Sequence, residues 1–288
     1  MKNKIQVSNL KKSYNNKIVL KGISFNVYEG CVFALLGANG AGKTTTLECI
    51  EGIKSYDNGE IFIDGEIGVQ LQSSSLPKEI KGYEALELFS RWKNTCLDKD
   101  LIHSLGIKNI LKTQYKEMST GQKRRLHLAL ALIGNPDIIF LDEPTAGLDV
   151  EGRIALHDEI RKLKALGKTI IMATHDMSEV EALCDKLAIL KSGKIIFTGT
   201  INELKSNIKN IYKIMIKTSS QFPYEKLSFA TYKGFLQDYY CFDVTKIHDG
   251  LLELMTIAKN NNIIISDIQI EHKSLENCFM DMVKEDKQ

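Results

Sequence analysis

The stretch Gly-Ala-Asn-Gly-Ala-Gly-Lys-Thr-Thr at residues 37–45 constrains the fold of this chain more than any other feature of its sequence. Its glycine, lysine and threonine spacing matches a phosphate-binding P-loop. A short apolar run at residues 32–36 precedes it, as expected of a strand buried on both faces, and apolar residues at helical spacing follow it. A glycine-rich turn could match the pattern by accident, but a P-loop requires this strand–loop–helix context. We therefore predict an α/β fold built around this loop.

The loop residues predict how phosphates would be held. Glycines allow backbone N–H groups to turn toward the β- and γ-phosphates, and the start of a helix adds a partial positive charge. Lys43 would place a positive charge on those phosphates, and the Thr44 hydroxyl would hold Mg²⁺. The predicted phosphate-binding residues are Gly37, Ala38, Asn39, Gly40, Ala41, Gly42, Lys43, Thr44 and Thr45.

Composition narrows the class of protein. The chain has 288 residues, a hydrophobic content of 43% and a formal net charge of +2, so it can bury a full core and lacks the basic excess of a dedicated nucleic-acid binder. Its six cysteines form no Cys-x-x-Cys pair, which is typical of buried thiols in a reduced compartment. The first 13 residues do not resemble a secretory signal, and the apolar runs are shorter than the roughly 18 residues that cross a bilayer. We expect the chain itself to be soluble.

Two later apolar runs end in polar residues that suit hydrolysis. Residues 137–144 carry Asp142 and Glu143 just before Pro144, and residues 169–176 contain His175. Ligands of parallel sheets sit outside the carboxyl ends of the strands, so we expect these side chains to meet the P-loop at one edge. Asp142 would hold Mg²⁺ through water, Glu143 would polarise a water for attack on the γ-phosphorus, and His175 would hydrogen-bond the γ-phosphate. Each residue alone has an ordinary structural explanation, but together they predict a hydrolytic site.

Residues 118–134 begin with a capping box, Ser119-x-x-Gln122, and continue with an apolar helical stripe. A well-capped helix would explain this pattern. The stretch also resembles the Leu-Ser-Gly-Gly-Gln signature of the ATP-binding cassette (ABC) family, which lies just before the Asp-Glu-Pro strand. The resemblance covers residues 3–205 and implies that Ser119, Gly121 and Gln122 bind the γ-phosphate of ATP held by a second copy. Met118 and Thr120 depart from the signature.

The same resemblance assigns three further residues. Tyr14 matches an aromatic side chain that stacks on adenine, and a tyrosine at a strand end is the structural alternative. Gln72 matches a glutamine that contacts Mg²⁺ and the attacking water, with Gln70 as a competitor. Asp149 matches a loop that crosses between paired cassettes, and it equally suits the N-cap of the following helix.

The predicted fold class is an α/β P-loop nucleotide-binding cassette with a helical subdomain, followed by a small α+β C-terminal extension. We place the cassette at residues 1–205, with the helical subdomain at about 73–135, and the extension at residues 206–288. In the extension we predict strands at 211–217 and 261–270 and a helix at 249–260 capped by Asp249. Residues 273–283 resemble the ending of exporter-type cassettes, although an ordinary amphipathic helix would look the same.

The resemblance implies an ATP- and Mg²⁺-dependent ATPase subunit of a bacterial ABC exporter. It implies a separate transmembrane partner gripped by the helical subdomain, a second copy of the cassette, and a peripheral position on the cytoplasmic face of the membrane. A soluble cassette ATPase acting on nucleic acid or ribosomes is the alternative, but the chain has a single cassette and no basic tract, and we expect no nucleic-acid partner. A non-hydrolysing binding module is the third hypothesis, and intact Lys43, Asp142, Glu143 and His175 oppose it. Drugs, peptides, lipids and polysaccharides all remain candidate substrates.

Overall fold

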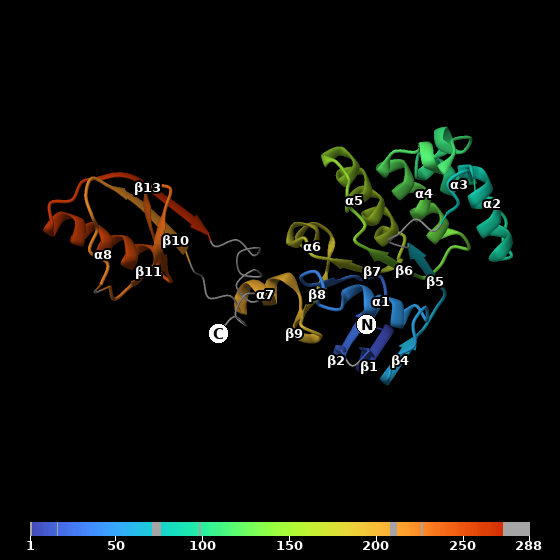
Figure 1. Cartoon of the computed structure of the whole chain (residues 1–288), viewed down its shortest axis with the longest axis horizontal. Helices are drawn as coiled ribbons and strands as arrows, with labels where there is room; N and C mark the ends of the chain where they lie inside the picture. Colours follow the sequence, from blue (N-terminus) through green and yellow to red (C-terminus); the bar gives the residue numbers. More distant parts are fainter. Residues whose placement is uncertain are drawn as a thin grey trace. The chain divides into compact units, whose positions relative to one another are not determined.

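The computed structural model describes residues 2–15, 17–70, 76–97, 99–207, 212–225 and 227–272. The chain divides into two compact units, Met1–Ile201 and Asn202–Gln288 (Figure 1). The boundary proposed from the sequence, between residues 205 and 206, falls inside helix α7 (Ile201–Asn207), a few residues from this division. No helix among the described residues combines the length and apolar character needed to span a membrane.

A six-stranded sheet forms the centre of the first unit. Its order is β5-β6-β7-β3-β8-β9; the strands from β5 to β8 run parallel, and β9 is antiparallel to β8. Every residue of β3, β6 and β7 is buried, which explains their continuous apolar sequences. The predicted parallel P-loop sheet is thereby confirmed. The strands are β3 (Val32–Leu36), β5 (Ile67–Gln70), β6 (Ile138–Asp142), β7 (Thr169–Thr174), β8 (Lys186–Lys191) and β9 (Lys194–Gly199).

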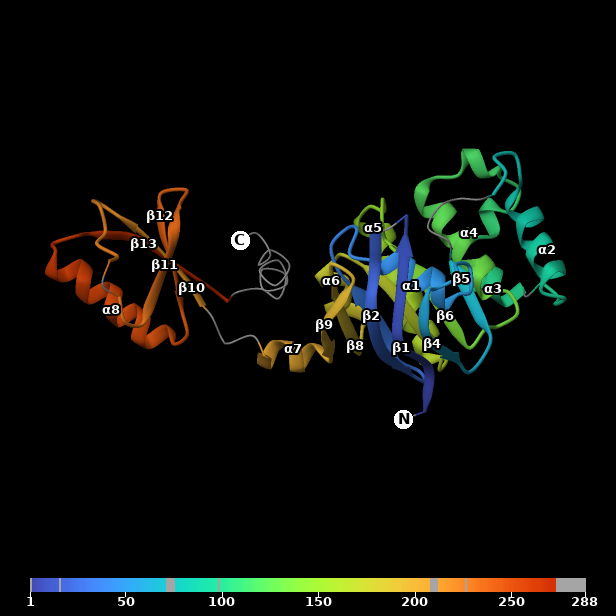
Figure 2. The ribbon, with the colours of Figure 1, turned by 60° about the horizontal axis from the view of Figure 1, so that its bottom comes forward.

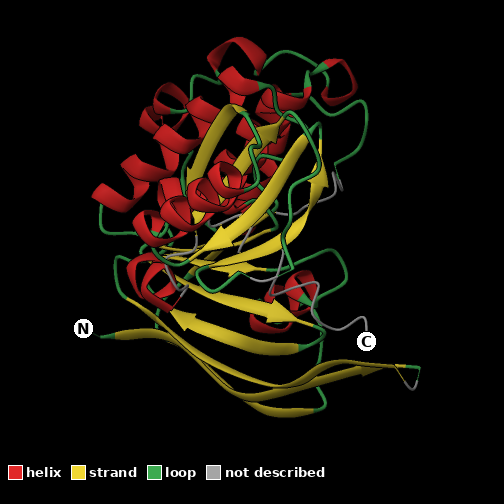
Figure 3. Ribbon diagram, turned by 90° about the vertical axis from the view of Figure 1, so that its left-hand side faces the viewer, coloured by secondary structure: helices red, strands yellow, loops and turns green. Residues whose placement is uncertain are grey.

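A three-stranded antiparallel sheet of order β2-β1-β4 completes the β-structure of this unit. Its strands are β1 (Asn3–Tyr14), β2 (Lys17–Tyr28) and β4 (Asn58–Ile63). The long β1–β2 hairpin lies at the bottom of Figure 3. Apolar side chains of this sheet share a buried core with β3 and the first helix, and the rings of Phe25 and Phe33 stack with their centroids 5.3 Å apart.

Helices cover the six-stranded sheet and form a separate group at one side of the unit. They are α1 (Lys43–Ile50), α2 (Gly82–Trp92), α3 (Lys99–Ser104), α4 (Thr120–Leu132), α5 (Val150–Ala165) and α6 (Met177–Leu183). Figures 1 and 2 show α2, α3 and α4 gathered together, and all three lie in the stretch predicted to be a helical subdomain. The predicted helix at 118–134 is α4, and its capping box is present.

The second unit contains a four-stranded antiparallel sheet of order β11-β12-β10-β13 and one long helix. Its elements are β10 (Tyr212–Thr218), β11 (Ala230–Leu236), β12 (Tyr239–Val244), α8 (Ile247–Asn260) and β13 (Ile265–His272). Apolar residues of the strands form its core together with Leu254 and Ala258 of α8.

Two details of the second unit correct the sequence predictions. Asp249 is not the N-cap of α8, because the helix begins two residues earlier and Lys246 occupies the cap position. Strand β13 begins at Ile265 rather than 261, because a turn with a positive φ of 53° at Asn262 separates it from α8. The exporter-like ending at 273–283 lies outside the described residues.

Candidate functional site

The P-loop joins β3 to α1, and two of its glycines are required by the local geometry. Gly42, the N-cap of α1, has φ 111°, and a Cβ there would lie 2.8 Å from Leu20. A Cβ on Gly37 would lie 2.5 Å from the carbonyl oxygen of Leu190. No side chain caps the start of α1, and its first turn carries no acidic residue. The N–H groups at this end of the helix therefore suit an anion.

Lys43 lies over the loop that precedes it. Its side chain is only 6% exposed, and its Nζ donates to the carbonyl oxygens of Gly37 at 2.9 Å and Ala38 at 3.4 Å. The same Nζ is 3.4 Å from Oε1 of Glu143. The ammonium group is therefore held between the phosphate loop and the end of β6.

Glu143 and His175 follow neighbouring parallel strands and contact each other. Oε2 of Glu143 is 2.7 Å from Nδ1 of His175, and the Glu143 backbone N–H donates to the Ala173 carbonyl at 2.9 Å. Glu143 has a φ of 48°, which is unusual for a residue other than glycine and is often found at functional sites. The structure thus brings Lys43, Glu143 and His175 together at one edge of the sheet, as the parallel topology predicts.

Asp142 is a buried carboxylate beside this cluster. The residue is 7% exposed, and its Oδ1 has no hydrogen-bond partner among the described residues. Burial raises the pKa of Asp142, while a hydrogen bond from the Thr44 side chain lowers it. A buried oxygen without a partner suits a cation, and a carboxylate with a hydroxyl matches the ligands that Mg²⁺ prefers. No group of three or more His, Cys, Asp or Glu among the described residues could hold a metal ion, so further ligands would come from phosphate and water.

A cleft of about 650 Å³ lies against the P-loop and has Tyr14 on its wall. Tyr14 is 37% exposed, and the ammonium groups of Lys12 and Lys54 lie 5.0 and 5.5 Å from its ring centroid. An exposed ring on the wall of the phosphate cleft suits the predicted adenine stacking. Of the predicted residues, Tyr14, Asn39, Gly40, Gly42, Lys43, Thr44, Thr45 and Glu143 line this cleft.

Five cleft residues were not singled out from the sequence: Lys17, Ile18, Val19, Lys21 and Ser192. Lys17 and Lys21 both lie on β2 shortly after Tyr14, and two lysines so close to a candidate adenine-binding tyrosine are a signal that could have identified them. Ser192 reaches the cleft from the turn between β8 and β9, far from the motifs in sequence, and no local pattern marks it.

The two candidate glutamines have different outcomes. Gln72 lies outside the described residues, so its assignment stays a prediction. Gln70, the competitor, ends β5 with a side chain that is 2% exposed, and its Nε2 donates to the Arg124 carbonyl of α4 at 3.3 Å. Gln70 therefore connects the sheet to the helix that follows the signature.

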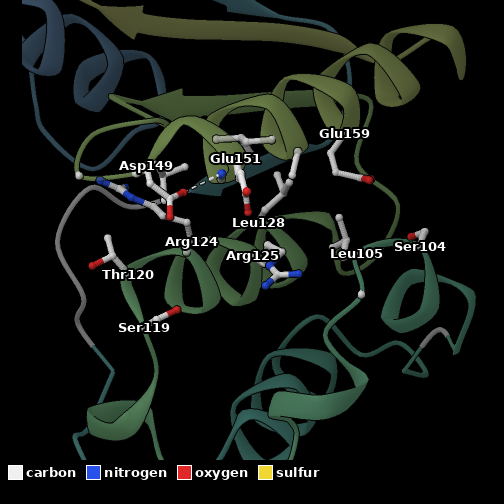
Figure 4. Close-up of a pocket in the computed structure, with 17 residues that line it drawn as sticks. Ser104, Leu105, Ser119, Thr120, Arg124, Arg125, Leu128, Asp149, Glu151 and Glu159 are labelled. Carbon is white, nitrogen blue, oxygen red and sulfur yellow. Dashed lines mark hydrogen bonds between the residues drawn. The ribbon is translucent and has the colours of Figure 1, made fainter.

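Three of the signature residues, Ser119, Thr120 and Gly121, line a second cleft, also of about 650 Å³, between α4 and α5. Figure 4 shows Ser119 and Thr120 at the start of α4 and Asp149 and Glu151 at the start of α5, on opposite walls. Ser119 accepts a hydrogen bond from the Gln122 N–H at 3.2 Å, and Gln122 accepts one from the Ser119 N–H at 2.9 Å. Among the described residues, none lines both clefts.

The two departures from the signature are accommodated locally. Thr120 and Gly121 lie in the first turn of α4, and neither has a positive φ, so threonine causes no backbone strain at position 120. Met118 is 4% exposed and occupies an apolar position as leucine would. Asp149 caps α5 by accepting a hydrogen bond from the Gly152 N–H at 2.8 Å, which confirms the N-cap interpretation; its role between paired cassettes stays a prediction.

Comparisons with known proteins agree with this geometry. The family model described as ABC transporter matches residues 20–146. An uncharacterized ABC transporter ATP-binding protein of Methanocaldococcus jannaschii is 41% identical over 71% of this chain and 80% of its own length. The Nod factor export ATP-binding protein I of Burkholderia orbicola is 38% identical over 69% of this chain and 72% of its own length. The uncharacterized ABC transporter ATP-binding protein YhcH of Bacillus subtilis is 28% identical and covers 100% of this chain and 98% of its own length.

Solved structures give the same result. The structure of an ATP-binding subunit of an ABC transporter has a TM-score of 0.64 at 26% identity, covering 70% of this chain and 92% of its own. The dimeric structure of a bacterial ABC transporter cassette has a TM-score of 0.63 at 25% identity, covering 68% of this chain and 98% of its own. The phosphate cleft, the signature helix and these relatives lead to one conclusion: the chain belongs to the ABC transporter ATP-binding family, whose members bind and hydrolyse ATP.

Proposed function

We propose that this chain is the ATP-hydrolysing subunit of an ABC exporter, which works as a pair of cassettes beneath a separate transmembrane subunit. The observation that carries this proposal is the contact of Glu143 with both Lys43 and His175 at the wall of the phosphate cleft. A carboxylate in this place can accept a proton from a water that attacks the γ-phosphorus, which is the role of a general base.

His175 orients the carboxylate. Because Glu143 accepts a hydrogen bond through Oε2, Nδ1 of His175 carries the hydrogen. The second carboxylate oxygen of Glu143, Oε1, lies 3.4 Å from Nζ of Lys43. Once Lys43 contacts the phosphates instead, Oε1 would be the oxygen that accepts the proton of the attacking water.

The remaining roles follow from the cleft. Thr44 and Asp142 would hold Mg²⁺, which supplies neutralisation of the charge on the β- and γ-phosphates. Tyr14 would stack on adenine, because its ring is exposed on the wall of the same cleft. For Gln72 we carry over the role predicted from the sequence, which is to contact Mg²⁺ and the attacking water.

Two copies are needed because the signature lines a different cleft from the P-loop. A second copy related by a two-fold axis would offer Ser119, Gly121 and Gln122 to the ATP of the first, in a self-complementary interface. The dimeric structure of a bacterial cassette supports this arrangement.

A surface on α2 supports contact with a membrane partner. Tyr83, Leu88 and Trp92 are 42%, 55% and 74% exposed, a concentration of large apolar side chains that suits a protein interface. Such a contact would hold the chain at the cytoplasmic face of the membrane. Similarity to Nod factor export ATP-binding proteins supports export as the direction.

A mixing experiment tests the paired mechanism. Ser119→Arg blocks the signature half-site and Lys43→Ala blocks the phosphate half-site, so each variant alone should be inactive. A mixture forms heterodimers with one intact site, and we expect hydrolysis to reappear at up to half the wild-type rate per dimer. Continued inactivity of the mixture, or hydrolysis at full rate by a strictly monomeric protein, would contradict the pairing. Co-purification with a membrane partner and substrate-stimulated ATPase activity then test transport.

A further inference from the structure

Glu179 of α6 is a buried carboxylate outside the motifs discussed above. The residue is 1% exposed, and both of its oxygens are occupied. Oε1 accepts a hydrogen bond from the Thr145 hydroxyl, and Oε2 accepts one from the Thr174 hydroxyl at 2.6 Å. A buried carboxylate is costly unless it is hydrogen-bonded, and these two hydroxyl groups satisfy both of its oxygens.

The two threonines are neighbours of the residues proposed to hydrolyse ATP. Thr145 lies two residues after Glu143, and Thr174 lies immediately before His175. The Thr174 hydroxyl oxygen also accepts a hydrogen bond from the Asp176 N–H at 3.0 Å. This bond joins the residue before His175 to the residue after it. One carboxylate on α6 therefore connects the segment after β6 to the end of β7.

Glu143 needs such support. Its positive φ of 48° is costly for a residue with a side chain and persists only where the surroundings hold it. Two backbone hydrogen bonds hold its peptide groups, from the Glu143 N–H to Ala173 and from the Ala146 N–H to Glu143. The hydrogen bond from Thr145 to Glu179 adds a side-chain anchor two residues after Glu143.

We propose that Glu179 is a positioning residue, which fixes the distance between Glu143 and His175 by holding Thr145 and Thr174 with its two oxygens. This inference rests on the proposed function, because it assumes that Glu143 is the base. A carboxylate suits the place because both partners donate hydrogen bonds and both carboxylate oxygens accept them. A glutamine would match one threonine and present an N–H₂ group to the other.

The expected effect falls on the rate of hydrolysis and not on the binding of ATP. Glu179 lines neither the phosphate cleft nor the signature cleft. Displacement of a catalytic group by about 1 Å can cost about 10²-fold in rate. We expect Glu179→Gln and Thr145→Val each to lower kcat by about 10- to 100-fold with little change in KM.

The experiment measures kcat, KM and equilibrium ATP affinity for both variants, together with thermal unfolding. Glu181→Gln is the matched control, because Glu181 is an exposed carboxylate on the same helix, and it should behave as wild type. A double-mutant cycle completes the test. In the Glu143→Gln background, Glu179→Gln should lower the residual rate no further, because there is no base left to position.

The outcomes separate this inference from the proposed function. If Glu143→Gln is inactive while Glu179→Gln and Thr145→Val hydrolyse ATP at the wild-type rate, the positioning role is wrong and the proposed function stands. If kcat and ATP affinity fall together, or if the two losses simply add in the cycle, Glu179 has only a general structural role and the inference fails. If Glu143→Gln itself hydrolyses ATP normally, the proposed function fails, and the inference fails with it.

Discussion

Replacing Lys43 with alanine should weaken ATP binding by an amount that its surroundings allow us to estimate. The Lys43 side chain is 6% exposed, and the oxygens that its Nζ contacts, two carbonyls and Oε1 of Glu143, all lie within 3.4 Å. In the complex it would contact phosphate oxygens in a site already shielded from water. Hydrogen bonds to charged groups contribute about 1.5–3 kcal/mol. We therefore expect Lys43→Ala to raise the Kd for ATP about 10- to 100-fold, since 1.4 kcal/mol is a factor of ten.

The assay is an equilibrium titration with a fluorescent ATP analogue, with displacement by unlabelled ATP. Lys162→Ala is the control, because Lys162 is an exposed lysine on α5 that pairs with Glu159 and lines neither the phosphate cleft nor the signature cleft. It removes the same charge from the chain and should leave the Kd unchanged. An equal Kd for Lys43→Ala and wild type, with both proteins folded, would refute the placement of Lys43 on the phosphates.

Three further predictions concern other parts of the first unit. Tyr14→Ala should weaken ATP binding by roughly 1–3 kcal/mol in the same titration, and unchanged affinity would leave Tyr14 as a strand-end residue. Ser119→Arg should abolish hydrolysis in a phosphate-release assay while monomeric ATP affinity stays near wild type; a parallel loss of affinity would contradict its role in trans. Burial lowers the pKa of His127 from 6.5 to about 4 in the folded state, so the unfolded chain takes up the proton first as the pH falls. The stability of wild type relative to His127→Leu should fall by about 3 kcal/mol between pH 6.5 and 4. Denaturant unfolding of both proteins measures this difference, because other groups such as Glu51, whose pKa burial raises to about 7, titrate in both; a difference that stays constant with pH would contradict the prediction.

The strongly patterned parts of the cassette could be predicted from the sequence. The apolar run at 32–36 coincides with β3, because a strand buried on both faces favours apolar residues at every position. Asp142, Glu143 and His175 could be placed at one edge, since parallel strands all point their carboxyl ends the same way. These inferences needed only local composition and the direction of the chain.

Features that depend on tertiary contacts could not be predicted. Nothing in the sequence near Glu179 shows that its carboxylate meets two threonines from other segments, one of them 34 residues away. Gln70 and Gln72 are both polar residues after the same apolar run, and only the hydrogen bond to α4 shows where Gln70 goes. The start of α8 was misplaced because Asp249 is a good N-cap residue in isolation, whereas the Gly250 N–H donates to the Lys246 carbonyl at 3.1 Å and closes the first turn earlier.

The most direct test of the account is the ATP turnover of Glu143→Gln. The amide keeps the size of the side chain and cannot accept a proton, and general-base catalysis contributes about 10²–10⁴-fold. We predict that this variant binds ATP, loses hydrolysis by a factor in that range, and accumulates as an ATP-bound dimer in size-exclusion chromatography. Near-normal turnover by Glu143→Gln would show that Glu143 is not the base and would contradict the mechanism proposed for this cleft.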